Sequence, residues 1–246
     1  FKVKILVACE ESQAVTKELR ILGHDAFSCD LLGCSGGRPD WHFKSDVFQV
    51  IEDNGGYLEN GDIIDDGKPW EMMIAHPPCT YLAVSGARWM YDPDDSHLPI
   101  SERREHPRFP GRRQKQKDAI DFIDQLWNSG IPKIAIENPV GVLSTKWGEK
   151  GKKPNQIVQP YQFGDEASKK TCLWLKNLPN LKETNVVGKG DMVTLKSGRK
   201  LPKWYSDALT KAKTPDERRT LRSKTFQGFA RAMAEQWAGN LTANSK

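Results

Sequence analysis

The fold is decided by the segment Val3-Lys4-Ile5-Leu6-Val7-Ala8 and by the residues that follow it up to Asp30. The opening run is short and apolar, which is typical of a buried strand. A helical pattern from about Gln13 to Leu22 follows, with apolar side chains three and four residues apart, and Gly23 is a natural helix stop. Asp25 to Asp30 then predicts a second strand, so the chain opens with a β-α-β unit.

The same alternation continues along the chain. Further strands are predicted in three apolar runs, at residues 72–75, 133–136 and 171–175, and amphipathic helices at 118–127 and 229–237. Strands alternating with helices predict an α/β fold with a doubly wound, mostly parallel sheet whose ligands bind at the carboxyl ends of the strands. We expect residues 81–113 to form an extended, mobile active-site loop.

Polar residues follow the apolar strands at the points where a doubly wound sheet binds its ligands. These residues are Glu10, Asp30, Asp46, Cys79 and Glu137. Since the carboxyl ends of parallel strands meet at one edge, we expect their side chains to face a common cleft.

Cys79 is the first candidate for chemistry. Pro77 and Pro78 precede it and fix the backbone, which suits a thiol that must meet its target at one angle. The structural alternative is a packed cysteine in a tight turn.

Glu137 is the second candidate, because it ends an apolar strand and begins Glu137-Asn138-Pro139. We expect partial burial to raise its pKa, so that it can share a proton with a ring nitrogen. The structural alternative is an Asn-Pro turn with a helix-capping acid. Taken together, a thiol and an acid can activate a pyrimidine: the thiolate adds to carbon 6, carbon 5 gains electron density, and the acid stabilises the adduct at nitrogen 3.

Two motifs resemble those of the DNA (cytosine-5) methyltransferases. His76-Pro77-Pro78-Cys79-Thr80 is similar to the family's Pro-Cys nucleophile motif, and Glu137-Asn138-Pro139 is similar to its Glu-Asn-Val, in the same order. With Thr171-Cys172-Leu173-Trp174-Leu175, they resemble in particular a compact, phage-type branch, and this resemblance covers nearly the whole chain. It implies a Rossmann-like S-adenosylmethionine-dependent methyltransferase fold, with S-adenosylmethionine as methyl donor and carbon 5 of cytosine in DNA as acceptor.

The resemblance also implies roles for individual residues. Lys169 and Lys170 stand where the family has the arginines of Gln-x-Arg-x-Arg, and join Cys79 and Glu137 as catalytic residues. The donor site is assigned to Cys9, Glu10, Asp30, Asp46, Pro77 and Asn240. Within this set, Asp30 corresponds to the acid that binds the ribose hydroxyls, and Asp46 to the acid that contacts the adenine amino group. The family's Phe-x-Gly-x-Gly is missing near Cys9.

DNA contacts are expected from two basic segments. One follows the nucleophile, and its candidate phosphate-binding residues are Arg103, Arg104, Arg108, Arg112 and Arg113, with Trp89 and Tyr91 available to stack. The other, which includes Lys203, lies in a short basic insertion at 177–224, a reduced target-recognition element. The catalytic domain then comprises 1–176 and 225–246. A solvated charged loop is the alternative for the first segment, since acids are interspersed in it.

Composition sets the wider limits. The 246 residues include 37% hydrophobic residues and give a net charge of +5, a weak indication of a polyanionic partner. No apolar run is long enough to span a membrane, no leader is evident, and five scattered cysteines do not form a disulfide framework. We therefore expect a protein of the bacterial or phage-infected host cytoplasm. The sequence does not indicate an oligomeric state.

Several alternatives stay open. Cys29, Cys34, His24 and His42 match no structural-zinc spacing, so we expect no metal. The acceptor can instead be cytosine in RNA or a free nucleotide, or the transferred group can be other than methyl. A non-catalytic, methyltransferase-like DNA-binding protein is the alternative from another class, although a pure binder needs neither Cys79 nor Glu137.

Overall fold

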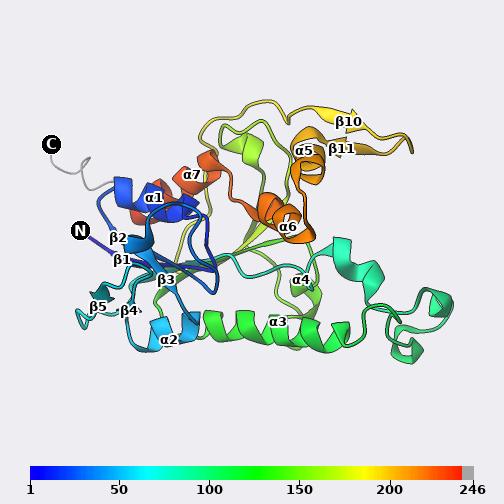
Figure 1. Ribbon diagram of the computed structural model, residues 1–246, viewed down its shortest axis with the longest axis horizontal. Coiled ribbons are helices and arrows are strands. Elements are labelled where there is room, and N and C mark those ends of the chain that lie inside the picture. Colours follow the sequence, from blue (N-terminus) through cyan, green and yellow to red (C-terminus); the bar gives the residue numbers. More distant parts are fainter. Residues whose placement is uncertain (240–246) are drawn as a thin grey trace.

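The computed structural model describes residues 1–239 and shows an α/β protein with a central sheet flanked by helices (Figure 1). The sheet has seven strands: β1 (Lys4–Ala8), β2 (Asp25–Asp30), β3 (His42–Lys44), β6 (Met72–Ala75), β7 (Lys133–Pro139), β8 (Gln156–Val158) and β9 (Thr171–Lys176). A small separate hairpin consists of β4 (Gly56–Tyr57) and β5 (Ile63–Ile64).

The strand order is β3-β2-β1-β6-β7-β9-β8. The pairs from β3 to β7 are all parallel, whereas β9 runs antiparallel to both β7 and β8. The order reverses between β1 and β6, the switch point where doubly wound sheets bind their ligands. The predicted α/β class and mostly parallel sheet are confirmed.

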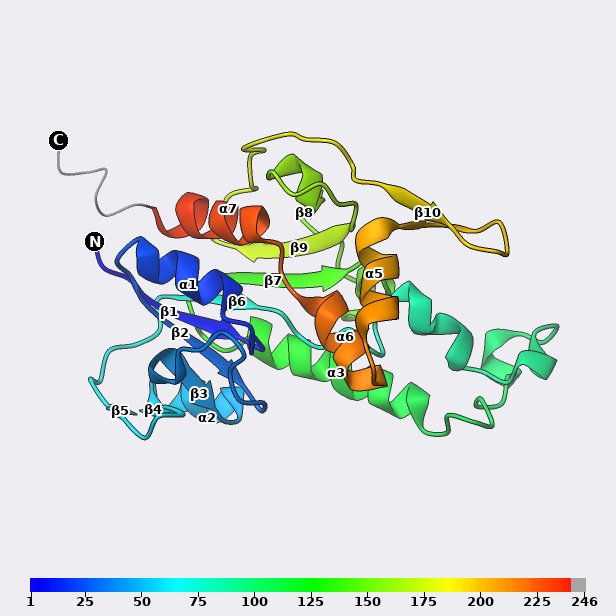
Figure 2. The ribbon, with the colours of Figure 1, turned by 45° about the horizontal axis from the view of Figure 1, so that its top comes forward.

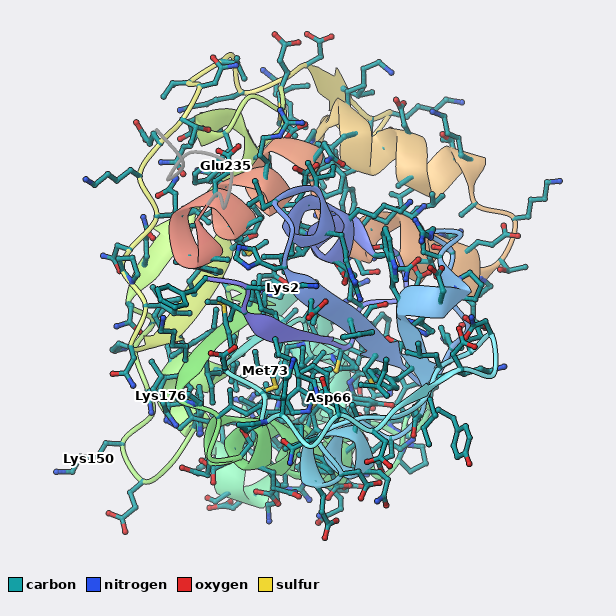
Figure 3. The ribbon with its side chains drawn as sticks, turned by 90° about the vertical axis from the view of Figure 1, so that its left-hand side faces the viewer. Lys2, Asp66, Met73, Lys150, Lys176 and Glu235 are labelled. Atoms are coloured by element: carbon teal, nitrogen blue, oxygen red, sulfur yellow. The ribbon has the colours of Figure 1, made fainter. Side chains whose placement is uncertain are left out.

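The sheet is buried on both faces and so has two cores. Along β1, Leu6 and Ala8 face one core and Ile5 and Val7 face the other, as the two-residue period of a strand requires. One face is covered by α1 (Ala14–Ile21) and α7 (Gln227–Ala238), the other by α2 (Val47–Glu52) and α3 (Arg112–Trp127) (Figure 1). Figure 3 shows Met73 inside the molecule, where it is fully buried, and Lys150 pointing into solvent.

The segment after Cys79, predicted as an extended loop, has a different structure. It contains three short 3-10 helices, at Val84–Trp89, Pro93–Asp95 and Ile100–Glu102, rather than an extended loop. Its side chains pack on one another, with Trp89 edge-on to His106 and Phe109. The helix expected at residue 118 begins at Arg112, directly after Gly111, whose φ of 73° lies in the left-handed region.

The basic insertion at 177–224 contains a hairpin and two helices. The hairpin joins β10 (Met192–Thr194) to β11 (Lys200–Pro202), and the helices are α5 (Lys203–Lys211) and α6 (Pro215–Ser223). In Figure 2 the hairpin projects from the body of the protein, while α5 and α6 lie side by side. Trp204 anchors α5 by packing edge-on against Phe226 and donating a hydrogen bond to the Ser168 carbonyl.

Within residues 1–239, no helix has the length and apolar character needed to cross a membrane.

Candidate functional site

Strand register places one row of side chains along the carboxyl edge of the sheet. The last paired row across the four central strands is Cys29, Ala8, Ala75 and Ile136. One residue further along each strand come Asp30, Cys9, His76 and Glu137. The topology therefore aligns residues more than 100 positions apart, such as Asp30 and Glu137, along one edge of the sheet, with two strands between them.

His76 and Glu137 form the innermost contact of this row. His76 Nδ1 lies 3.1 Å from Glu137 Oε2, and only 10% and 16% of the two side-chain surfaces are exposed. Burial opposes charge on both groups, but the hydrogen bond and the mutual attraction outweigh it. They raise the pKa of His76 and lower that of Glu137. The sequence had predicted a raised pKa for Glu137, and the prediction is wrong because the partner, His76, had not been recognised.

Cys79 follows on a turn that is fixed from both sides. Asn138 Nδ2 donates to the Pro77 carbonyl at 2.9 Å, and the Cys79 carbonyl accepts hydrogen bonds from Leu82 and Ala83, each at 3.0 Å. Burial raises the pKa of the Cys79 thiol, and the negative charge of Glu137 adds to this effect. Both effects favour the neutral thiol form of Cys79.

Two cations act against that rise in the pKa of Cys79. Lys169 and Arg222 both lower it. The two residues are joined, since Lys169 Nζ donates to the Arg222 carbonyl at 3.1 Å, and the Arg222 guanidinium lies over the Tyr205 ring. Lys170 is exposed, whereas Lys169 is half-buried. The structure thus brings Lys169 to the nucleophile, together with an arginine of α6.

Buried polar atoms without partners gather near the nucleophile. Among the described residues the buried atoms without a hydrogen-bond partner are His76 Nε2, Asn138 Oδ1, Arg112 Nε, Arg222 Nε and Ser129 Oγ. Asn138 donates to the Pro77 carbonyl and Arg112 to the Thr80 carbonyl, His76 lies three residues before Cys79, and the charge of Arg222 acts on the Cys79 thiol. Because buried polar groups are normally satisfied, such a concentration is typical of a site for a polar ligand.

A cavity of about 580 Å³ lies at the switch point of the sheet, next to the turn that carries Cys79. The sequence predicts a common cleft for the polar residues that follow the strands, but Cys79 and Glu137 do not line this cavity. Its walls combine carboxylates, aromatic rings and the turn around Cys79. They comprise Cys9, Cys29, Asp30, Leu31, Ser45, Asp46, Val47, Phe48, Pro78, Thr80, Tyr81, Lys115, Asp118, Ala119 and Phe122. Phe48 and Phe122 pack edge-on with their ring centres 5.3 Å apart. A cavity of this volume is in the range of cofactor sites.

The predicted donor-site residues fall into three groups. Cys9, Asp30 and Asp46 line the cavity. Asp30 accepts a hydrogen bond from Leu32 N, and burial raises its pKa; Asp46 accepts from Phe48 N and so caps α2. Glu10 does not line the cavity, and Asn240 lies outside the described residues.

Glu10 has a structural task. Its buried carboxylate accepts hydrogen bonds from Val15 N, Thr16 N and the Thr16 hydroxyl at the start of α1. Carboxylates are favourable at this end of a helix. Pro77 is also buried and away from the cavity, whose wall is instead formed by Pro78.

Most of the predicted DNA-contact residues already have partners inside the protein. Arg104 pairs with Asp95 at 2.8 Å and lowers the pKa of Asp95 to about 2. Arg103 donates to two backbone carbonyls, Arg112 to the Thr80 carbonyl, Arg113 lies 3.5 Å from Glu105, and Lys203 pairs with Asp207.

Arg108 is exposed, and its side chain has no hydrogen bond or ion pair with the described residues. The two rings expected to stack are engaged as well, since Trp89 packs on His106 and Arg113 lies over Tyr91.

The sequence did not indicate several residues of the site. Phe48, Phe122 and Asp118 of the cavity come from the faces of α2 and α3, and Arg222 from α6. The sequence offers one indication of a further site residue, because His76 stands only three residues before Cys79.

Residues 1–239 contain no group of three or more His, Cys, Asp or Glu side chains arranged to hold a metal ion. His42 instead contacts Ser28 Oγ and the Leu32 carbonyl. Comparison with models of known protein families gives no match, and no curated protein matches the chain.

Proposed function

We propose that this protein transfers a methyl group from S-adenosylmethionine to carbon 5 of cytosine in DNA, through a covalent adduct on Cys79. The observation that carries the proposal is the position of Cys79 just after β6, where the charge of Glu137 on the neighbouring strand β7 acts on its thiol, next to a cavity lined by Asp30 and Asp46. A thiol packed for structural reasons needs neither a buried acid nor two cations near it.

The cavity fits the methyl donor in its chemistry. Phe48 and Phe122 offer apolar and aromatic surface to an adenine ring, and Asp30 and Asp46 offer oxygen acceptors to ribose hydroxyls and an amino group. When bound, the donor supplies an electrophilic methyl group on a positively charged sulfur. Because Pro78 and Thr80 belong to the same wall, a ligand in this cavity lies next to the nucleophile.

The residues around Cys79 then act on the cytosine ring. The Cys79 thiolate forms a bond to carbon 6, and the ring electrons shift to carbon 5, which becomes nucleophilic. Glu137 holds nitrogen 3, where negative charge would otherwise develop, and Lys169 and Arg222 stabilise the anionic thiolate. After carbon 5 is methylated, loss of its proton and elimination of the Cys79 sulfur restore the aromatic ring.

DNA as the acceptor rests on the resemblance of the two motifs and on the excess of basic residues. The target base must leave the helix stack to reach Cys79, at a cost of a few kcal/mol. Exposed Arg108 and the basic insertion are the candidates for phosphate contacts that offset this cost.

A transfer assay tests the substrate class. Labelled S-adenosylmethionine is incubated with the protein and duplex DNA, single-stranded RNA or dCMP, and the product base is identified by mass spectrometry. The proposal expects 5-methylcytosine in DNA and none with Cys79→Ala. Product only in RNA or dCMP would move the activity to that substrate, and DNA binding without product in any arm would indicate a binding protein.

A further inference from the structure

His76 belongs to the row of side chains along the carboxyl edge of the sheet, and the family resemblance assigns it no role. It stands one residue past the last paired row of the sheet, directly beside Glu137, because Ala75 pairs with Ile136. Its backbone N–H donates to the Ala8 carbonyl at 2.9 Å, so the backbone position is fixed by β1. The side chain is nine-tenths buried, with Nδ1 against Glu137 and Nε2 without a partner among the described residues.

We propose that His76 is a positioning residue that holds the proton Glu137 delivers to the cytosine ring. This inference rests on the proposed function. It follows from the geometry because Glu137 has one carboxylate oxygen committed to a buried imidazole, leaving the other oxygen free for a ring nitrogen.

The proton transfer balances without any further reactant. As the Cys79 sulfur bonds to carbon 6, the proton of Nδ1 on the His76 imidazolium moves to the Glu137 carboxylate, which becomes a carboxylic acid and then gives a proton to nitrogen 3. The imidazolium becomes neutral imidazole, Glu137 is a carboxylate again, and the ring gains one proton. When the sulfur is eliminated, nitrogen 3 loses its proton, which returns through Glu137 to His76.

The surroundings of His76 favour its protonated form and raise the pKa of the imidazole. Burial opposes the charge, but Glu137 and, at longer range, Glu10 raise the pKa of His76, while Lys169 lowers it. The remaining titratable neighbours are the thiols of Cys9, in the same row, and Cys79, and burial raises the pKa of each. The thiols thus stay neutral over the range in which His76 titrates.

The pH dependence of the rate follows from the two groups. The reaction needs protonated His76 and deprotonated Cys79. Below the pKa of His76 the rate rises tenfold per pH unit as the thiolate fraction grows. Above it, each further gain in thiolate is cancelled by the loss of imidazolium, so the rate levels off well before the thiol has titrated.

The test compares the wild type with His76→Asn, whose amide can still donate to Glu137 but cannot carry a proton. Single-turnover methylation of DNA is measured from pH 6 to pH 9.5, with His97→Asn, a change at an exposed loop histidine, as the matched control. We expect His76→Asn to lose about 100-fold in rate at pH 7 and its rate to keep rising past the pH at which the wild type levels off. The control should follow the wild type.

A second measurement needs no variant. The pKa of His76, obtained by NMR titration of the wild-type protein, should coincide with the pH at which the wild-type rate levels off. A wild-type profile without that break, or a His76→Asn profile that levels off at the same pH, overturns the role of His76 and leaves the proposed function standing. A wild-type protein that methylates nothing at any pH overturns the proposed function, and this inference with it.

Discussion

The two halves of the sheet's carboxyl edge are built differently. The half formed by β1, β2 and β3 borders an open cavity of about 580 Å³ with aromatic walls, and its carboxylates Asp30 and Asp46 accept hydrogen bonds only from neighbouring backbone N–H groups. The half formed by β6, β7 and the start of β9 is closed, polar and charged, with His76 paired to Glu137. This difference is the one that the proposed function requires, with the methyl donor bound at the first half and the reacting groups held at the second.

Replacing Cys79 should show the difference between the two halves most clearly, because it should abolish methylation without weakening donor binding. Cys79→Ala is expected to reduce methylation to background, because no other described thiol stands at the end of β6, while the affinity for S-adenosylmethionine changes less than twofold. Radiolabelled transfer and calorimetric titration measure the two effects. A large loss of donor affinity in Cys79→Ala would contradict the separation of donor binding from the reacting groups.

Removing the acid should have the next largest effect. Glu137→Gln is expected to slow methylation 10²- to 10⁴-fold, the usual contribution of a positioned acid or base. The pKa of His76 should fall at the same time, because Glu137 raises it most and burial is then opposed only by the charge of Glu10. Stopped-time assays and NMR titration of the histidine follow both changes. An unchanged His76 pKa would contradict the pairing.

Substitutions in the half formed by β1, β2 and β3 should have a smaller effect, and should weaken donor binding rather than slow the reaction. Asp30→Asn is expected to weaken donor binding about tenfold, equivalent to 1.4 kcal/mol, the scale of one charge-assisted hydrogen bond. The rate at saturating donor should stay near that of the wild type. Asp46→Asn, which keeps a capping side chain for α2, serves as a matched variant, since asparagine is as good a cap as aspartate.

The smallest effect is expected from the cation of α6. Arg222→Gln should raise the pKa of Cys79 and slow its alkylation by iodoacetamide severalfold at pH 8, since Arg222 favours the thiolate. Arg218→Gln, an exposed arginine in the same helix, is the control and should leave the alkylation rate unchanged. Equal alkylation rates for both variants and the wild type would show that Arg222 does not affect the pKa of Cys79.

The sequence predicted the sheet well because its strands are buried on both faces and read as continuous apolar runs. It placed Asp30 correctly at the end of its strand, whereas β7, predicted to end before Glu137, continues to Pro139. It did not predict the partner of Glu137, because the contact with His76 depends on the register between β6 and β7. A shift of that register by one residue would turn the two side chains to opposite faces of the sheet.

The peripheral segments were predicted least well. Residues 84–111 are polar and rich in proline, yet they fold around ion pairs such as Arg104 with Asp95, which no periodicity shows. For the same reason four of the five predicted DNA-contact arginines, all except Arg108, have partners within the protein. Arg222 reaches the nucleophile through helix packing, and nothing in the local sequence distinguishes it from its basic neighbours.

The most direct test of the central claim is covalent capture. Duplex DNA in which cytosine is replaced by 5-fluorocytosine is incubated with the protein and S-adenosylmethionine, since fluorine at carbon 5 cannot leave as a proton would and the adduct persists. We predict a denaturation-resistant complex whose digestion yields the peptide containing Cys79 joined to a methylated fluorocytosine nucleotide. A complex linked through another residue, or no complex while 5-methylcytosine is formed on ordinary DNA, would contradict the account.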